Sequence, residues 1–138
     1  MLLLLSKRGK GMKQLFLIST VFVLSLLLTG CNQQPNIDMG EVLGKTEETL
    51  RKLEEIETTV SSFDGEKDIK FRLMVEENIS NEDATILFNE ILESIAQHSN
   101  YSDVWDYYNG YFDIKSYDNG VIYEATKLKD QDLDVISK

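Results

Sequence analysis

Apolar positions recur every three or four residues near the start of the polar part of the chain, and this spacing predicts an amphipathic helix over residues 41–62. The stripe consists of Leu43, Thr46, Leu50, Leu53, Ile56, Val60 and Phe63. Two interpretations of this helix stay open. It packs on its own domain, or it pairs with a second copy or another protein through Leu43, Leu50, Leu53 and Val60.

The pattern then changes to strict alternation over residues 68–77, which predicts a strand with one solvated face. Its apolar face consists of Ile69, Phe71, Leu73 and Val75. A second amphipathic helix is predicted over residues 81–97, with Ser80 as its N-cap. Glu82 and Asp83 lie in its first turn, where the helix dipole favours carboxylates.

A second β region is predicted between residues 101 and 127. Asn109-Gly110 and residues 118–120 (Asp-Asn-Gly) favour hairpin turns, because these residue types accept positive φ. Alternation predicts strands over residues 111–117 and 121–127. Residues 104–108 fit either a further strand or a short helical turn. We expect residues 128–138 to be a charged tail that either forms a last helical turn or has no regular structure.

This order of elements predicts an α+β fold. A strand with one wet face cannot lie in a sheet that is covered on both sides. We therefore expect a two-layer sandwich in which helices cover one face of a mixed or antiparallel sheet. The single domain is expected over residues 40–127.

The first 30 residues differ from the rest. They contain four basic residues and no acidic one, and residues 15–28 are apolar except for two Ser and one Thr. This apolar run is shorter than the ~20 residues that cross a bilayer. A basic segment followed by a short apolar one is typical of a secretory signal peptide. Met12 is a candidate initiator, since Met12-Lys13 makes a compact start for such a signal.

Leu28-Thr29-Gly30-Cys31 follows this run and resembles the lipobox of bacterial lipoprotein precursors. The resemblance implies that residues 1–30 are removed by cleavage between Gly30 and Cys31, and that the Cys31 thiol carries a diacylglyceryl group. Two acyl chains suffice for a stable membrane anchor. Residues 31–39 would then form the lipid attachment and a short tether. The implied location is the outer leaflet of the bacterial cell membrane, outside the cytoplasm.

Charge narrows the choice of partners. The chain has 14 Lys and Arg against 24 Asp and Glu, so residues 31–138 hold 10 basic and 24 acidic residues, a net charge of −14. Nucleic acid is excluded as a partner because phosphate binding needs a basic surface. Anionic wall polymers would be repelled. A neutral or cationic partner fits better.

Aromatic residues concentrate in one segment, because all six Tyr and the single Trp lie between residues 101 and 123. Such rings can form a platform for a saccharide or a peptide, with Asp and Asn side chains for its polar groups. The candidate binding surface consists of Trp105, Asp106, Tyr107, Asn109, Tyr111 and Tyr117. The alternative is ordinary strand packing, since aromatic residues favour strands and pair across hairpins.

No arrangement of residues indicates catalysis. His98 is the single imidazole, and it lacks a second His or a nearby Cys. No metal site or cofactor is expected. We expect a non-enzymatic binding or interaction module for a protein or a neutral wall or saccharide ligand. The alternatives are an assembly subunit that pairs through helix 41–62 and, last, a small hydrolase that uses Asp106 or Asp113.

Overall fold

A computed structural model describes residues 34–138, and residues 35–138 form one compact unit. The predicted signal segment, with Gly30, and the predicted lipidation site Cys31 lie outside the described residues. The elements in chain order are α2 (Met39–Arg51), β1 (Ile56–Phe63), β2 (Asp68–Val75), α3 (Asn81–Ser99), the 3-10 helix η1 (Val104–Asp106), β3 (Asn109–Ser116), β4 (Gly120–Lys127) and β5 (Asp134–Ser137).

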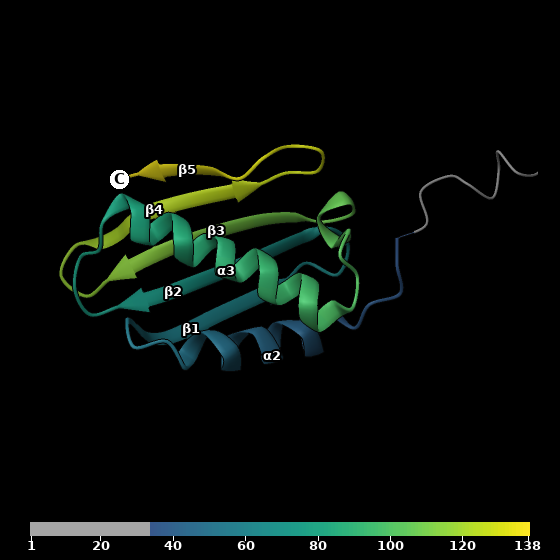
Figure 1. Cartoon of the computed structure of the whole chain (residues 1–138), viewed down its shortest axis with the longest axis horizontal. Coiled ribbons are helices and arrows are strands. Elements are labelled where there is room, and N and C mark those ends of the chain that lie inside the picture. The colour runs from purple at the N-terminus through teal and green to yellow at the C-terminus, as the bar shows by residue number, and fades with distance from the viewer. Residues whose placement is uncertain (1–33) are drawn as a thin grey trace, which may run out of the picture. The chain divides into compact units, whose positions relative to one another are not determined.

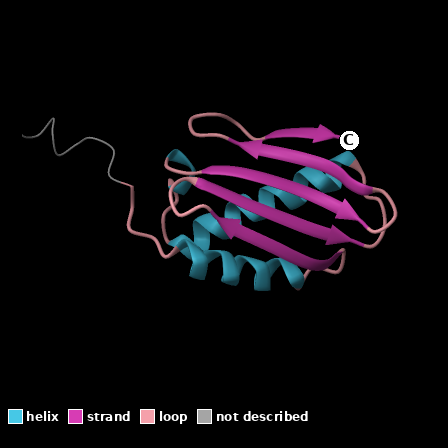
Figure 2. Ribbon diagram, turned by 180° about the vertical axis from the view of Figure 1, so that it is seen from behind, coloured by secondary structure: helices cyan, strands magenta, loops and turns pink. Residues whose placement is uncertain are grey.

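The strands form one mixed sheet in the order β1-β2-β3-β4-β5. Strands β2 and β3 are parallel and the other neighbouring pairs are antiparallel. Helix α3 connects the two parallel strands, as a crossover between parallel strands requires. Both α2 and α3 lie on one face of the sheet (Figure 1), and the view from behind shows the strands in front of them (Figure 2). The expected two-layer α+β fold is confirmed.

The core lies between the two helices and the sheet. Alternation in β2 buries Ile69, Phe71, Leu73 and Val75, as predicted. The ring of Phe112 on β3 stacks on Phe88 of α3 at 6.4 Å between centroids and meets Trp105 edge-on at 5.9 Å. The predicted cap of α3 is confirmed, because the Ser80 side chain accepts a hydrogen bond from the Asp83 N–H. Asn100 ends this helix in the left-handed conformation.

The predicted helix over residues 41–62 is wrong in its second half. Helix α2 ends at Arg51, and Ile56–Phe63 is the edge strand β1. The segment 56–60 reads Ile-Glu-Thr-Thr-Val, and β-branched residues favour strands. Glu47 joins the two elements, because its carboxylate accepts hydrogen bonds from the Thr59 hydroxyl at 2.8 Å and the Ser61 hydroxyl at 2.9 Å.

Two further predictions need correction. Asn109-Gly110 does not form a hairpin turn but begins β3, where Gly110 is paired with Ile69 of β2. The tail after residue 127 is not helical: residues 134–137 return as β5 and pair with β4. The turn at residues 118–120 is confirmed, with Gly120 at φ +69° between β3 and β4. Residues 104–106 form a short helical turn, which decides between the two alternatives for that segment.

Candidate binding face

The sheet face opposite the helices carries two rows of side chains that run across all five strands. We call this surface the open face. Strand register places one residue of each strand in each row. The charged row consists of Val60, Arg72, Asp113, Glu124 and Ile136. The hydroxyl row, next to it, consists of Ser62, Lys70, Tyr111, Thr126 and Asp134.

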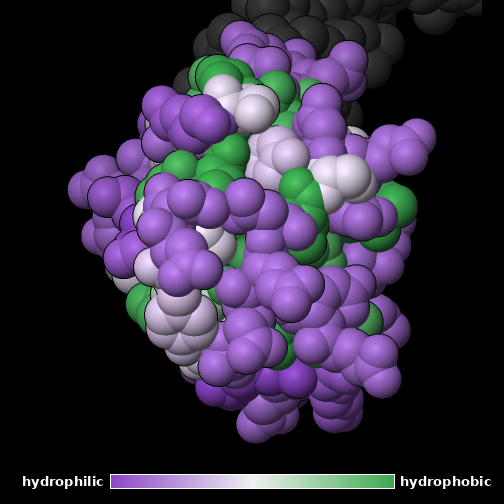
Figure 3. Space-filling view, turned by 90° about the vertical axis from the view of Figure 1, so that its left-hand side faces the viewer, coloured by the Kyte–Doolittle hydropathy of each residue, from purple (hydrophilic) through white to green (hydrophobic). Residues whose placement is uncertain are grey.

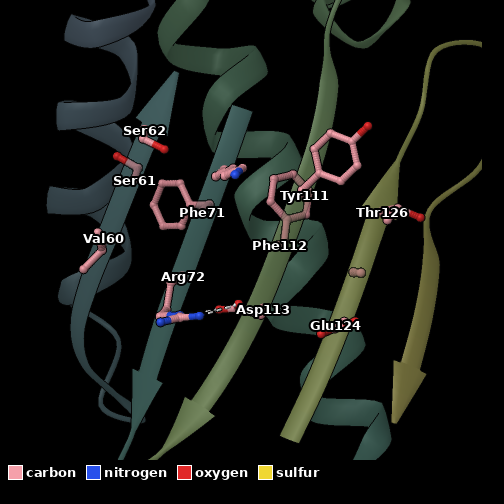
Figure 4. A pocket seen from close by; sticks show the side chains of 12 residues that line it. Val60, Ser61, Ser62, Phe71, Arg72, Tyr111, Phe112, Asp113, Glu124 and Thr126 are labelled. Carbon is pink, nitrogen blue, oxygen red and sulfur yellow. Dashed lines mark hydrogen bonds and ion pairs between the residues drawn. The ribbon is translucent and has the colours of Figure 1, made fainter. Parts of the chain in front are cut away.

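A hollow of about 460 Å³ lies on this face over β1 to β4. Figure 4 shows Arg72, Asp113 and Glu124 side by side along it, with Tyr111 and Thr126 in the neighbouring row. Phe71, Phe112 and Ala125 line its floor although they belong to the core-facing positions of their strands. Its size falls within the range of ~300–1,000 Å³ that small-ligand sites occupy.

Arg72 and Asp113 form the centre of the charged row. Arg72 Nε lies 2.7 Å from Asp113 Oδ1, and Nη2 lies 2.8 Å from Oδ2, so the pair is bidentate. Hydrogen bonding to Asp113, and then its charge, raise the pKa of Arg72. The Asp113 side chain is 23% exposed, so water screens this pair only in part.

Glu124 lies directly opposite Asp113 across the β3–β4 pair. Like charges in this position repel. Each carboxylate has a cation of its own, because Arg72 pairs with Asp113 and Lys138 Nζ lies 3.3 Å from Glu124. The charged row therefore combines several hydrogen-bonding groups with little net charge.

Of the predicted aromatic surface, Tyr111 belongs to the open face. Its side chain is 38% exposed beside Thr126 and Lys70. Trp105 is part of the core instead, where its indole Nε1 donates to the Leu92 carbonyl at 3.1 Å. The aromatic residues thus divide between the core and the surface, and they do not form one platform.

Tyr117 lies at the other end of β3 from Tyr111. Six residues of strand separate them by roughly 20 Å, too far for one small ligand ring to touch both. The Glu57 charge is the largest cause that raises the pKa of the exposed Tyr117, followed by desolvation, hydrogen bonding to Glu57 and the charge of Glu76. Figure 3 views the domain from this end, which is mostly hydrophilic. Tyr117 is therefore part of an acidic edge.

The polar members of the predicted surface are also separated. Asn109 supports the fold, because its side chain donates to Asp68 Oδ1 at 3.2 Å and accepts from the Lys129 N–H at 3.0 Å. Asp106 is exposed in η1, and Tyr107 follows it, half-buried. Asn109 lies on the same face of β3 as Tyr111, two residues away, whereas Asp106 and Tyr107 lie outside the strands.

The predicted helix-pairing residues do not form one stripe. Leu43 and Leu50 are buried in the core of their own domain, and Leu53 packs partly against that core. Val60 lies in β1 on the open face and is 58% exposed. The proposed dimer through helix 41–62 lacks its structural basis, since residues 56–62 are a strand.

The two carboxylates named as alternatives for a hydrolase, Asp106 and Asp113, lie in different elements. Asp106 lies in η1, whereas Asp113 on β3 has both oxygens engaged by Arg72. His98 Nε2 lies 3.0 Å from Thr49 Oγ1, so it links α3 to α2 on the covered side of the sheet. Within residues 34–138 no group of His, Cys, Asp or Glu is placed to hold a metal ion.

Sequence reasoning missed the central pair and both rows. The alternation in β2 did place Lys70 and Arg72 on a solvated face. It did not indicate that β2 is parallel to β3, and that pairing is what brings Arg72 to Asp113, 41 residues later. The available signal was Asp113, a carboxylate in a strand of alternating residues. Its partner Arg72 cannot be identified until the strand register is known.

The described residues 34–138 contain no helix long and apolar enough to cross a membrane. No protein-family model matches the chain, and the comparison with curated proteins found no match.

Proposed function

We propose that this protein is a lipid-anchored bacterial lipoprotein whose domain is a non-enzymatic binding module, and that the open face is its binding surface. The lipobox motif Leu28-Thr29-Gly30-Cys31 supports the anchor. The observation that carries the binding role is the hollow on the helix-free face, with the Arg72–Asp113 pair and a half-exposed Tyr111. Arg and Tyr are the residue types enriched at binding hot spots.

Photocrosslinking in native membranes tests the binding surface. A photoreactive phenylalanine analogue at Tyr111 should give a specific crosslinked product. The same group at Glu90, exposed on α3, is the matched control and should give none. Equal products from both positions, or products from Glu90 alone, would contradict a binding role for the open face.

Metabolic labelling tests the anchor separately. Cys31→Ser removes the thiol that would take the lipid, so fatty-acid labelling and retention in the membrane fraction should both be lost. Retention of both in Cys31→Ser would refute the anchoring mechanism. A failure of the anchoring test would not affect the crosslinking test, because Cys31 is not part of the compact unit formed by residues 35–138.

A further inference from the structure

The side chains that line the hollow have no net formal charge. Lys70 and Arg72 are balanced by Asp113 and Glu124. This balance stands out in a chain whose residues 31–138 sum to −14. An anionic ligand would need excess cations here, and a cationic ligand would need excess anions. The hollow is therefore best matched to an uncharged ligand.

The hollow also has hydrogen-bond donors and acceptors that the interactions within the protein leave available. A guanidinium has five N–H donors, and Arg72 uses one from Nε and one from Nη2 on Asp113. The hydroxyls of Ser62 and Thr126 bond to no protein group within the part of the chain that the structure describes. Each hydroxyl can both donate and accept. Donors and acceptors are thus mixed, which suits a ligand rich in hydroxyl groups.

Tyr111 supplies an apolar surface beside these polar groups. Figure 4 shows its ring next to the hollow, with the hydroxyl pointing away from the strand. An aromatic ring buries a large apolar area and keeps a polar tip. It can cover the apolar face of a ring whose edges carry hydroxyls.

From these three observations we infer that the hollow binds a neutral saccharide unit. Tyr111 covers one face of the sugar ring, and Arg72, Asp113 and Thr126 bond to its hydroxyls. This inference rests on the proposed function, because it names the ligand class of the same open face. It assigns the recognition to the two rows rather than to the aromatic segment that the sequence suggested.

The test is saturation-transfer NMR on the full chain in lipid nanodiscs, with empty nanodiscs as the blank. The probes are two neutral tetrasaccharides, one of N-acetylglucosamine and one of glucose, and an anionic hyaluronan tetrasaccharide. At least one neutral probe should bind. The anionic probe should bind at least about tenfold more weakly, because of repulsion by the acidic domain.

Variants assign the binding to the hollow. Tyr111→Ala and Arg72→Met should each weaken binding by about tenfold or more, as truncation of a hot-spot residue does. Matched controls outside the hollow are Tyr117→Ala and Arg51→Met, and both should bind as the unaltered protein does. Thr126→Val removes one hydroxyl and keeps the β-branched shape, so it should weaken binding without unfolding the strand.

Three results would overturn the inference. The first is no binding of either neutral probe at millimolar concentration. The second is that Tyr111→Ala and Thr126→Val bind as strongly as the unaltered protein, and the third is a preference for the anionic probe. A protein crosslinked at Tyr111 together with no saccharide binding would overturn the saccharide assignment and leave the proposed binding face standing. Saccharide binding without any crosslink to protein would support the inference.

Discussion

Arg72 on β2 and Asp113 on β3 are held in a bidentate pair across two parallel strands, with contacts of 2.7 and 2.8 Å. The two strands are the ends of the crossover that contains α3. The pair thus joins the two strands in their observed register at the centre of the open face. It also restrains the guanidinium of Arg72, which lines the hollow, and so pre-organises it for a ligand.

Breaking this pair should lower stability by a modest amount. Arg72→Met leaves a half-buried carboxylate without its partner, and we expect a loss of about 1 kcal/mol, because water reaches part of the pair. The double variant Arg72→Met/Asp113→Leu should recover part of this loss. Urea unfolding of both single variants and the double variant measures the coupling energy. Strictly additive losses would mean that the pair contributes no coupling.

Glu47 should matter more than its exposed neighbour Glu48. Glu47→Ala removes the acceptor of the Thr59 and Ser61 hydroxyls, of which Thr59 is buried. We expect a destabilisation of about 1–3 kcal/mol, the cost of leaving buried polar groups unpaired. Glu48→Ala should change stability by less than about 0.5 kcal/mol. Chemical denaturation compares the two, and equal effects would argue against the α2–β1 link.

Substitution by alanine should change the stability of the protein in opposite directions at Gly110 and Gly44. A Cβ at Gly110 would overlap the ring of Phe112, so Gly110→Ala should destabilise by about 1–3 kcal/mol. A Cβ at Gly44 in α2 meets nothing within 4 Å, so Gly44→Ala should stabilise by about 0.5–1 kcal/mol through helix propensity. Thermal unfolding measures both shifts. A neutral Gly110→Ala would show that the ring moves aside at little cost.

The stability that Asp64 gives to the β1–β2 turn should depend on pH in the acidic range. Its Oδ1 accepts from the N–H groups of Glu66, Lys67 and Asp68 at 2.8, 2.9 and 3.0 Å. The backbone hydrogen bond from Glu66 is the largest cause that lowers the pKa of Asp64 below 3.8. A lowered folded-state pKa means that the stabilisation is complete above pH 3.8 and is lost as the pH falls through the lower value.

Substitution of the carboxylate tests this sign. Asp64→Asn should be less stable than the unaltered protein at pH 7, and the difference should shrink at strongly acidic pH. Asp103→Asn is a suitable control, because the Asp103 side chain makes no capping hydrogen bond to η1. Urea midpoints at several pH values measure the effect. A difference that grows on acidification would contradict the lowered pKa.

Hydrophobic periodicity determined much of the fold. The alternation of Ile69, Phe71, Leu73 and Val75, and the stripe of α3, each have a period that only one type of element satisfies. The same reasoning failed at Ile56 and Val60, which continue the helical spacing of α2 by chance. Where helical and alternating spacings both fit, periodicity alone cannot distinguish a helix from a strand. In this segment, strand propensity and the hydrogen bonds to Glu47 favour the strand.

The candidate site, like the fold, could be predicted from the sequence only in part. The sequence by itself determined that β2 and β3 each have a solvated face and that Tyr111 is aromatic and Arg72 cationic. The lipid attachment at Cys31 stays a prediction from the resemblance of residues 28–31 to a lipobox. Only the tertiary structure decided that Trp105 lies in the core while Tyr111 lies on the surface. It also decided that Arg72 meets Asp113. The physical reason is that strand pairing between distant segments depends on how α3 packs on the sheet, and no local pattern encodes that register.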